Sequence, residues 1–323
     1  IAILPMISEE KRRLGMRIRR LGFIGEGVGG ADHLGMIARG EDISEALAEI
    51  YEHLAVDHSR DAVRFEYIDA DSSLANKNEV LGFASRRKAV ADICPQIDLG
   101  AGWDAVLQQS RRASNFKRRV KQIEKLSGYE FRSIIDPAEI SAAFERFLVL
   151  HERRWAASGG SELSGHPRLI EFQRSLVPQL AAAELIRFDE LWFEGTCRGS
   201  IYGLDDGRTF YYYNAGYDLE SANLSVGLVL LGLSIQAAAK RGVMLYDFLR
   251  GDEAYKSDWA NRRTELVDVS LHRNARLALA DEGIGRAISA AKTFSAGLLP
   301  SQATEMLKAW RRAWRRNYQL SGR

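Results

Sequence analysis

Cysteine is scarce in this sequence: Cys94 and Cys197 are the only two in 323 residues, and they lie in no metal-ligand spacing. Two distant cysteines do not make a disulfide framework, so we expect a reducing compartment, the cytoplasm. Long hydrophobic runs are also missing. The longest, residues 226–233, contains two glycines and is much shorter than the ~20 residues of a membrane span. No signal-peptide pattern is visible, and the start at Ile1 in a strand-like stretch suggests a missing or processed N-terminus.

The motifs of several enzyme classes are absent. The sequence has no zinc-ligand pattern, no HExxH and no G-x-S-x-G, and its six histidines are scattered. The glycine-rich Gly25–Gly30 is not followed by the Lys-Ser/Thr of a P-loop, so we interpret it as a flexible loop. These absences argue against a catalytic-triad hydrolase, and no metal site is predicted.

Positive charge is concentrated near the C-terminus. Six of the 45 basic residues lie between Lys308 and Arg323, where there is no acidic residue, so the rest of the chain is mildly acidic. This distribution argues against a nucleic-acid-binding protein as a whole. The basic tail either docks on an acidic membrane surface or partner, or packs its aromatic stripe on the body.

A second basic segment is the helix predicted at the end of residues 103–125. Its apolar residues Phe116, Val120 and Ile123 share one face, and its other faces are cationic. Two interpretations stay open: a solvated charged face, or the wall of an anion-binding cleft or docking site for an acidic partner.

The most informative stretch begins at residue 242. Residues 243–249 are apolar and β-rich and predict a buried strand, which Asp247 interrupts. A buried carboxylate must be paired or used in function. A glycine turn at Gly251 and the pair Tyr255-Lys256 follow it, and the region ends at Trp259.

The segment before this strand predicts a parallel crossover. Residues 209–217 read as a strand, and residues 226–241 as a buried helix that is capped by Ser225. A strand, helix and strand in this order join parallel strands. The free N–H groups at the helix start, around Ser225, Val226 and Gly227, form an anion site that suits the pyrophosphate of coenzyme A.

The remaining pattern predicts further strands and helices, with turns at Asp189-Glu190 and 205–207 inside an antiparallel meander. The predicted strands are 1–5, 17–24 (joined to the first by a polar turn), 61–68, 89–99, 129–135, 184–188, 191–193, 197–204 and 264–272. The predicted helices are 44–53, 103–125, 137–157, 166–183, 274–292 and 300–318.

Residues Tyr246–Trp259 resemble the D-F-x-x-G-x-x-x-Y-K-x-x-W signature of the CelD/BcsL-type acetyltransferases, which belong to the GNAT superfamily and are related to the Fem aminoacyl transferases. Ser225-Val226-Gly227 is similar to that family's S-P-G helix start, with Val226 in place of proline. The segment from Asn115 to Arg119 resembles its N-x-R-R helix. The resemblance implies a mixed α/β (α+β) fold of tandem GNAT-like halves, with central sheets flanked by helices. It implies an N-terminal half at 1–110, a GNAT domain at 111–273 and a basic helical tail at 274–323.

The resemblance also implies the chemistry: transfer of an acetyl or other acyl group from acyl-CoA, a co-substrate and not a bound cofactor, to an amine or hydroxyl of a small molecule or glycan. In the family the acceptor is linked to cellulose-type polysaccharide biosynthesis. Two alternatives stay open: a non-catalytic GNAT-fold component of a polysaccharide machine, and a Fem-like transferase that uses aminoacyl-tRNA.

The predicted roles fall into two groups. Asp247 is a general base or amine anchor, or else a structural carboxylate, and Tyr255 and Lys256 contact the acyl donor or acceptor. Trp259 is expected in the core. The residues predicted to bind the co-substrate are Tyr212, Asn214, Ser225, Val226 and Gly227.

Overall fold

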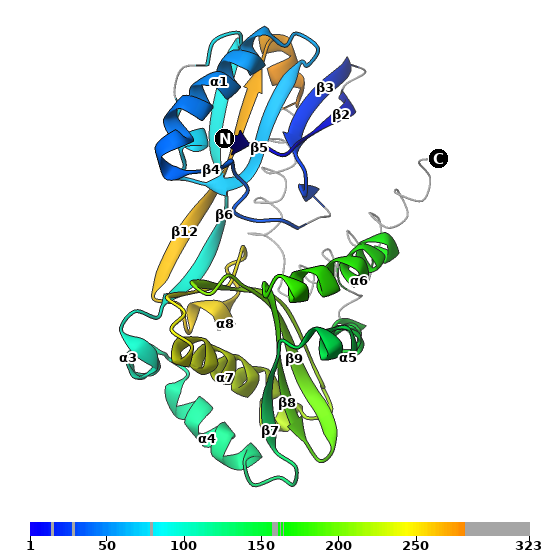
Figure 1. Cartoon of the computed structure of the whole chain (residues 1–323), viewed down its shortest axis with the longest axis vertical. Coiled ribbons are helices and arrows are strands. Elements are labelled where there is room, and N and C mark those ends of the chain that lie inside the picture. Colours follow the sequence, from blue (N-terminus) through cyan, green and yellow to red (C-terminus); the bar gives the residue numbers. More distant parts are fainter. Residues whose placement is uncertain are drawn as a thin grey trace, which may run out of the picture. The chain divides into compact units, whose positions relative to one another are not determined.

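The structure of the protein is a computed structural model, which describes residues 1–13, 16–27, 30–77, 80–156, 161, 163 and 165–281 (Figure 1). The chain forms two compact units, one of Ile1–Ile93 with residues 264–281 and one of Cys94–Arg263. The sequence placed the boundaries at residues 110 and 273 instead. The two divisions differ because β6 (Ser85–Asp98) and β12 (Arg262–His272) each contribute residues to both units. Of the predicted tail, only residues up to 281 are described, and residues 275–281 are helical.

The first unit is built on strands in the order β2-β3-β5-β12-β6. β3 and β5 are parallel, whereas β2/β3 and β5/β12 are antiparallel. One side of α1 packs its Leu47, Tyr51 and Leu54 against the core residues Phe65 and Ile68. The other elements of this unit are β1 (Ala2–Ile3), β2 (Met6–Arg13), β3 (Met16–Phe23), β4 (Ile37–Ala38), η2 (Gly40–Asp42), α1 (Ile43–Val56), β5 (Ala62–Asp69) and α2 (Ser73–Asn76).

The polar turn predicted between residues 5 and 17 was wrong, because most of this segment is the strand β2. Its charged side chains find partners on β3: Glu10 pairs with Arg17, and Glu9 with the buried Arg20. Cross-strand ion pairs put polar residues on both faces of the strand, so the alternation that identifies a half-buried strand is missing.

The second unit has strands in the order β6-β11-β10-β9-β8-β7. Helices α3, α4 and α7 cover one face of this sheet, and α5 and α6 cover the other (Figure 1). Ile201 and Tyr202, neighbours on β9, therefore belong to two different cores. The elements are α3 (Gly102–Gln109), α4 (Ala113–Ile123), β7 (Glu130–Ile134), α5 (Pro137–Ala156), α6 (Pro167–Ala182), β8 (Ile186–Phe193), β9 (Thr196–Asp205), β10 (Thr209–Tyr217), η3 (Ala222–Leu224), α7 (Val226–Lys240), β11 (Leu245–Asp247) and α8 (Ala254–Ser257).

The turn predicted at Asp189-Glu190 was also wrong, since both residues lie fully buried in the middle of β8. Asp189 accepts hydrogen bonds from the hydroxyls of Ser133 and Ser234. Burial raises the pKa of Asp189, whereas the hydrogen bonds from these two hydroxyls lower it. Two adjacent acids normally signal a turn. Inside the sheet they are satisfied by partners from other elements: Ser133 of β7 and Ser234 of α7 bond Asp189, and Arg146 of α5 pairs with Glu190.

The single helix predicted over residues 103–125 is two helices. The helical conformation is interrupted at Ser110, whose extended backbone ends α3. The Ser110 hydroxyl donates to the carbonyl of Asp258 and accepts from the N–H of Arg112, which starts the next helix. The fold class predicted from the sequence, a mixed α/β fold with large sheets flanked by helices, is confirmed. Among the described residues, no helix has both the length and the apolar character that crossing a membrane requires.

Arg273 holds the first unit together just after β12. Its guanidinium donates five hydrogen bonds to backbone carbonyls that surround the end of α1. A charged donor suits the exposed carbonyls at a helix C-terminus, where the helix dipole is negative. The accepting carbonyls belong to Leu54, Ala55, Asp57, Arg60 and Gly82.

We expect Arg273→Gln to lower the free energy of unfolding by about 2–4 kcal/mol, because it leaves several partly buried carbonyls without a donor. Urea unfolding followed by circular dichroism measures the change. Arg276→Gln, at a nearby exposed arginine, is the matched control and should leave the midpoint where it is. Equal midpoints for the two variants would contradict this role of Arg273.

Candidate active site

The crossover predicted from the sequence is present. β10 and β11 pair in parallel, with Phe210 opposite Tyr246, and α7 connects them. α7 is buried along most of its length, and its Ser234 is tied to Asp189 of β8. This bond fixes the position of α7 along the sheet, and with it the place where the helix begins.

The parallel strands β10 and β11 separate after a short paired stretch. Their pairing covers only residues 209–211 of β10, because β11 ends at Asp247 while β10 continues to Tyr217. Beyond that point the backbone of Ala215 bonds side chains: its N–H donates to Asn214, and its carbonyl accepts from Arg154 and His151. The parting of β11 from β10 opens a space beside the strand.

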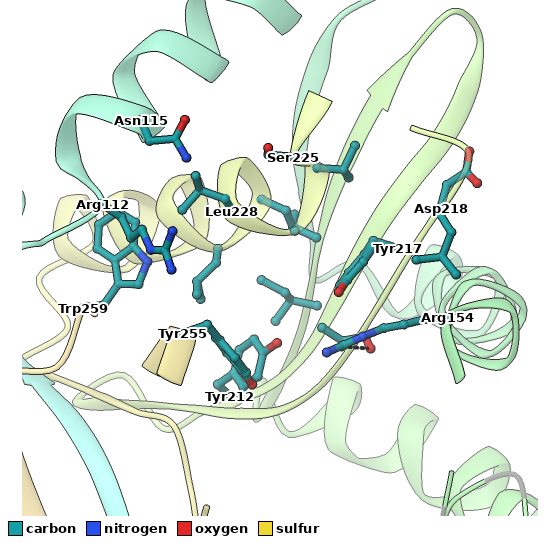
Figure 2. Close-up of a pocket in the computed structure, with 17 residues that line it drawn as sticks. Arg112, Asn115, Arg154, Tyr212, Tyr217, Asp218, Ser225, Leu228, Tyr255 and Trp259 are labelled. Carbon is teal, nitrogen blue, oxygen red and sulfur yellow. Dashed lines mark hydrogen bonds between the residues drawn. The ribbon is translucent and has the colours of Figure 1, made fainter. Parts of the chain in front are cut away.

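A cavity of about 440 Å³ occupies this space (Figure 2). Its wall is formed by α7, the later part of β10, the start of α4 and the segment after β11. A volume of this size is in the range of small-ligand sites. The lining residues are Arg112, Asn115, Arg154, Ile201, Tyr212, Ala215, Tyr217, Asp218, Leu219, Ser225, Val226, Gly227, Leu228, Leu230, Leu231, Tyr255 and Trp259.

The N-terminus of α7 opens into this cavity through Ser225, Val226 and Gly227. The predicted side-chain cap was wrong: Ser225 occupies the N-cap position with a left-handed backbone (φ 57°) and makes no side-chain capping bond. Its carbonyl accepts from Leu228 and Val229, while the N–H groups of the first helical residues have no partner within the helix. Gly227 packs closely on Tyr217, since a Cβ there would lie 3.0 Å from the ring and the ring would have to shift.

Two arginines add positive charge to the wall. Arg112 pairs with Asp258 at 2.6 Å. Arg154 comes from α5 and donates to the carbonyl of Ala215 at 2.9 Å, with its guanidinium over the ring of Tyr217 (Figure 2). Among the described residues Arg154 has only neutral partners, so its charge is available to attract an anion.

Tyr212 and Tyr255 lie side by side in the wall, with ring centroids 6.5 Å apart (Figure 2). Burial, then the neighbouring phenol of Tyr212 and the charge of Glu253, raise the pKa of Tyr255. Burial also raises the pKa of Tyr212. Both phenols are therefore neutral near pH 7, so they can donate protons or hydrogen bonds.

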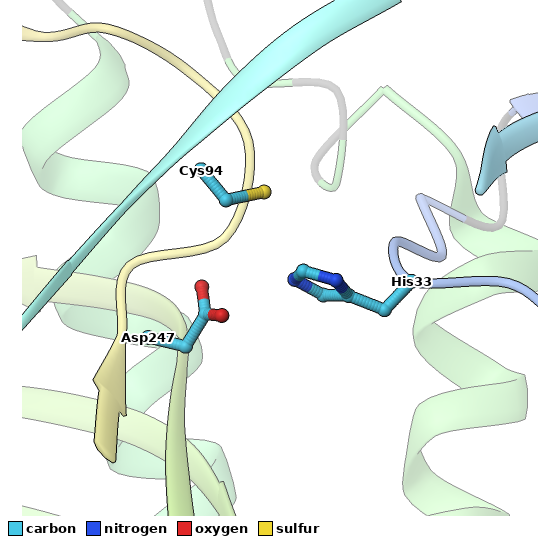
Figure 3. Close-up of side chains that lie close together, drawn as sticks. All are labelled: His33, Cys94 and Asp247. Atoms are coloured by element: carbon cyan, nitrogen blue, oxygen red, sulfur yellow. The ribbon is translucent and has the colours of Figure 1, made fainter. Parts of the chain in front are cut away.

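Asp247 lies outside the cavity wall. It is 1% exposed, and its carboxylate accepts from the side chain of Gln96 at 2.6 Å and from the N–H of Leu249 at 2.7 Å. The sulfur of Cys94 lies within 4.8 Å of this carboxylate (Figure 3). The bond to Leu249 agrees with the structural interpretation of Asp247 that the sequence left open.

Two other predicted site residues do not line the cavity. Lys256 is 4% exposed and bonds the carbonyl of Arg250 and the carboxylate of Glu253, at 2.8 and 2.9 Å. The side-chain oxygen of Asn214 accepts a hydrogen bond from the backbone N–H of Ala215. The structure brings together Tyr212, Ser225, Val226, Gly227 and Tyr255 of the predicted set.

Arg154, Tyr217 and Asp218 were missed by the sequence analysis. Arg154 lies far along the chain from the crossover, within an ordinary helical pattern, and no local signal marks it. It reaches the site because Gly216 lets α5 approach β10: a Cβ at Gly216 would lie 2.3 Å from the backbone nitrogen of His151. Trp259 is buried as expected and stacks on Trp103, while also touching the cavity.

Comparison with known proteins gives the class. Residues 110–257 match the family model described as the acetyltransferase (GNAT) domain, and this stretch contains every residue of the cavity wall except Trp259. The chain therefore carries a GNAT-type acetyltransferase domain. No curated protein matches the sequence.

Three solved structures are similar to the whole described fold, each at 10% sequence identity. FemX gives a TM-score of 0.59, over 84% of this chain and 85% of that one. The C-terminal domain (DUF2156) of a putative lysylphosphatidylglycerol synthetase from Agrobacterium fabrum gives 0.53, over 85% and 84%. A conserved protein of unknown function from Bacteroides thetaiotaomicron VPI-5482 gives 0.53, over 84% of each chain. At this identity the likeness shows the fold alone.

His151, which supports the same carbonyl as Arg154, predicts a pH dependence. Burial lowers its pKa from 6.5 to about 4. The unfolded chain then binds a proton that the folded chain does not, so stability is complete above about pH 6.5 and falls as the pH drops towards 4. The loss amounts to roughly 2–3 kcal/mol.

Urea unfolding between pH 7 and 4 measures this slope. We expect His151→Asn to reduce it, since asparagine donates to a carbonyl but does not titrate. His53→Asn, at an exposed histidine, is the control and should keep the slope of the unaltered chain. An unchanged slope in His151→Asn would rule out this assignment.

Proposed function

We propose that this protein is an acyltransferase that moves an acetyl or other short acyl group from acyl-CoA to an amine or hydroxyl. The observation that carries the proposal is the cavity between the parted strands β10 and β11, which joins a helix N-terminus at one side to two neutral phenols at the other. The GNAT match over residues 110–257 supports the same reaction class.

The co-substrate has a natural orientation in this cavity. Its pyrophosphate meets the N–H groups of Val226 and Gly227, whose helix dipole favours negative charge, and Arg112 lines the same cavity. The extended pantetheine arm follows the edge of β10 that β11 leaves open, as an added strand would. The thioester then lies towards Tyr212 and Tyr255.

The transfer forms one bond and breaks another. The acceptor nitrogen or oxygen attacks the thioester carbonyl, the carbon–sulfur bond breaks, and the thiolate takes a proton. Tyr255 is the proposed proton donor, because its phenol is neutral and lines the cavity. The proton lost by the acceptor passes to solvent, and the phenolate of Tyr255 takes a proton back from solvent.

For Asp247 and Lys256 we propose a positioning role. Asp247 bonds the N–H of Leu249, whose backbone is left-handed, and Lys256 bonds the carbonyl of Arg250. The two side chains stabilise the segment between β11 and α8, the helix that contains Tyr255.

The acceptor we propose is an amine or hydroxyl of a sugar in polysaccharide biosynthesis. This part of the proposal rests on the resemblance of Tyr246–Trp259 to CelD/BcsL-type enzymes.

Isothermal titration with acetyl-CoA tests the donor. We expect Arg112→Gln to weaken binding about tenfold, because a charged contact to phosphate is worth roughly 1–2 kcal/mol. Arg168→Gln, at an exposed arginine on α6, removes the same charge from the opposite face and should leave the affinity unchanged. Absence of binding by the unaltered chain to any acyl-CoA would refute the proposal.

Tyr255→Phe tests the chemistry. We expect kcat to fall about 10²–10³-fold, in the range of a lost general acid, while the Kd for acetyl-CoA stays the same. Release of free thiol from acetyl-CoA, with a panel of amino sugars as acceptors, gives the rate. Tyr213→Phe is the control, since the Tyr213 hydroxyl bonds Gln173 of α6 on the other face. Full activity in Tyr255→Phe would remove Tyr255 from the reaction.

A further inference from the structure

The outer face of α4 carries a row of basic side chains that the cavity does not use. Arg112 and Asn115 at its start line the cavity, and Phe116 and Ile123 are buried against α7. The remaining side bears exposed positive charge along about 16 Å of helix, from eleven residues at 1.5 Å each. The exposed basic residues on and beside this helix are Arg111, Lys117, Arg118, Lys121 and Lys125.

These charges are not neutralised within the described part of the chain. Lys117, Lys121 and Lys125 form no ion pair with any described residue. Arg118 and Arg119 bond the side-chain amides of Asn115 and Gln122, which are neutral. Holding like charges together on one helix face is unfavourable, so the face is suited to an acidic partner.

The placement of α4 relative to the cavity is fixed by close packing. A Cβ at Gly232 of α7 would lie 2.3 Å from the ring of Phe116, so α4 rests directly on the helix whose N-terminus opens into the cavity. Arg112 therefore lies at the cavity, and Lys117 and Lys121 lie about 8 and 14 Å further along the chain direction of the helix. A molecule bound in the cavity and on this face spans both.

The length of the basic face of α4 distinguishes between free acyl-CoA and a larger acidic partner as the donor. The phosphates of free coenzyme A form a compact group that the helix N-terminus and Arg112 can hold. The row from Lys117 to Lys125 continues past them and matches an extended acidic surface, such as the side of an acidic helix. The surface of α4 itself offers no exposed aromatic ring on which nucleic-acid bases would stack, which disfavours an RNA partner.

We propose that the α4 face, defined by Arg111, Lys117, Arg118, Lys121 and Lys125, docks an acidic carrier protein that delivers the acyl group on a phosphopantetheine arm. The inference rests on the proposed function and adds a second acyl donor to acyl-CoA for the same cavity. The arm has one phosphate for the N-terminus of α7, and its thioester enters the same cavity. The acceptor attacks the acyl carbon, the carbon–sulfur bond breaks, and the protonated thiol leaves on the carrier.

The test compares two double charge reversals in the full chain. Lys117→Glu/Lys121→Glu alters the α4 face, and Arg153→Glu/Arg168→Glu makes the same charge change at exposed residues of α5 and α6. Fluorescence anisotropy with a labelled, acetyl-loaded bacterial acyl carrier protein measures the Kd at low and at physiological salt. We expect the first variant to bind more than about tenfold more weakly and the second to bind like the unaltered chain.

Titration of each variant with acetyl-CoA separates the two claims. If the unaltered chain binds acetyl-CoA but not the loaded carrier, or if both double variants lose the carrier equally, the docking inference fails and the proposed function stands. If neither donor binds, the proposed function fails as well. Tighter binding of transfer RNA or of phosphatidylglycerol vesicles than of the carrier, lost in Lys117→Glu/Lys121→Glu, overturns the inference in favour of that partner.

Discussion

The site depends on where α7 is held. This helix is apolar nearly all round, so it is stable only when covered by the sheet on one side and by α3 and α4 on the other. Burial alone would let it slide along the sheet. The hydrogen bond from Ser234 to the buried Asp189 removes that freedom and fixes the level at which the helix begins.

Two glycines then allow helices α4 and α5 to pack closely enough to place their arginines near the start of α7. Gly232 admits the ring of Phe116, which sets α4 and its arginine against α7. Gly216 admits the backbone of α5, which carries Arg154 to the carbonyl of Ala215 on the other side of the opening. A side chain at either glycine would push a whole helix away, since protein interiors leave no room for added atoms.

The early end of β11 completes the arrangement. Had β11 continued beside β10, its backbone would have filled the open edge of the strand. The chain turns away after Asp247 instead, where Leu249 takes a left-handed backbone that the carboxylate stabilises by bonding its N–H. The turn returns Tyr255 to the cavity beside Tyr212, and the burial of both phenols keeps them protonated.

From the sequence alone, the resemblance of Tyr246–Trp259 to a known family implied the class of fold, and the local pattern predicted the crossover. Apolar periodicity and the positions of glycines are local signals, and they predicted the strand β10 and the helix α7 correctly. The pairing within the sheets was decided by tertiary contacts. The buried acids of β8 are acceptable only beside partners distant in the chain, on α5 and α7. The strand β2 was missed because its charged residues pair across the hairpin with β3 and hide the alternation of a half-buried strand. The same holds for the candidate site: Arg154 reaches it through packing at Gly216, and Asp247 and Lys256 bond the backbone of Leu249 and Arg250 and do not line the cavity, through contacts that no local pattern encodes.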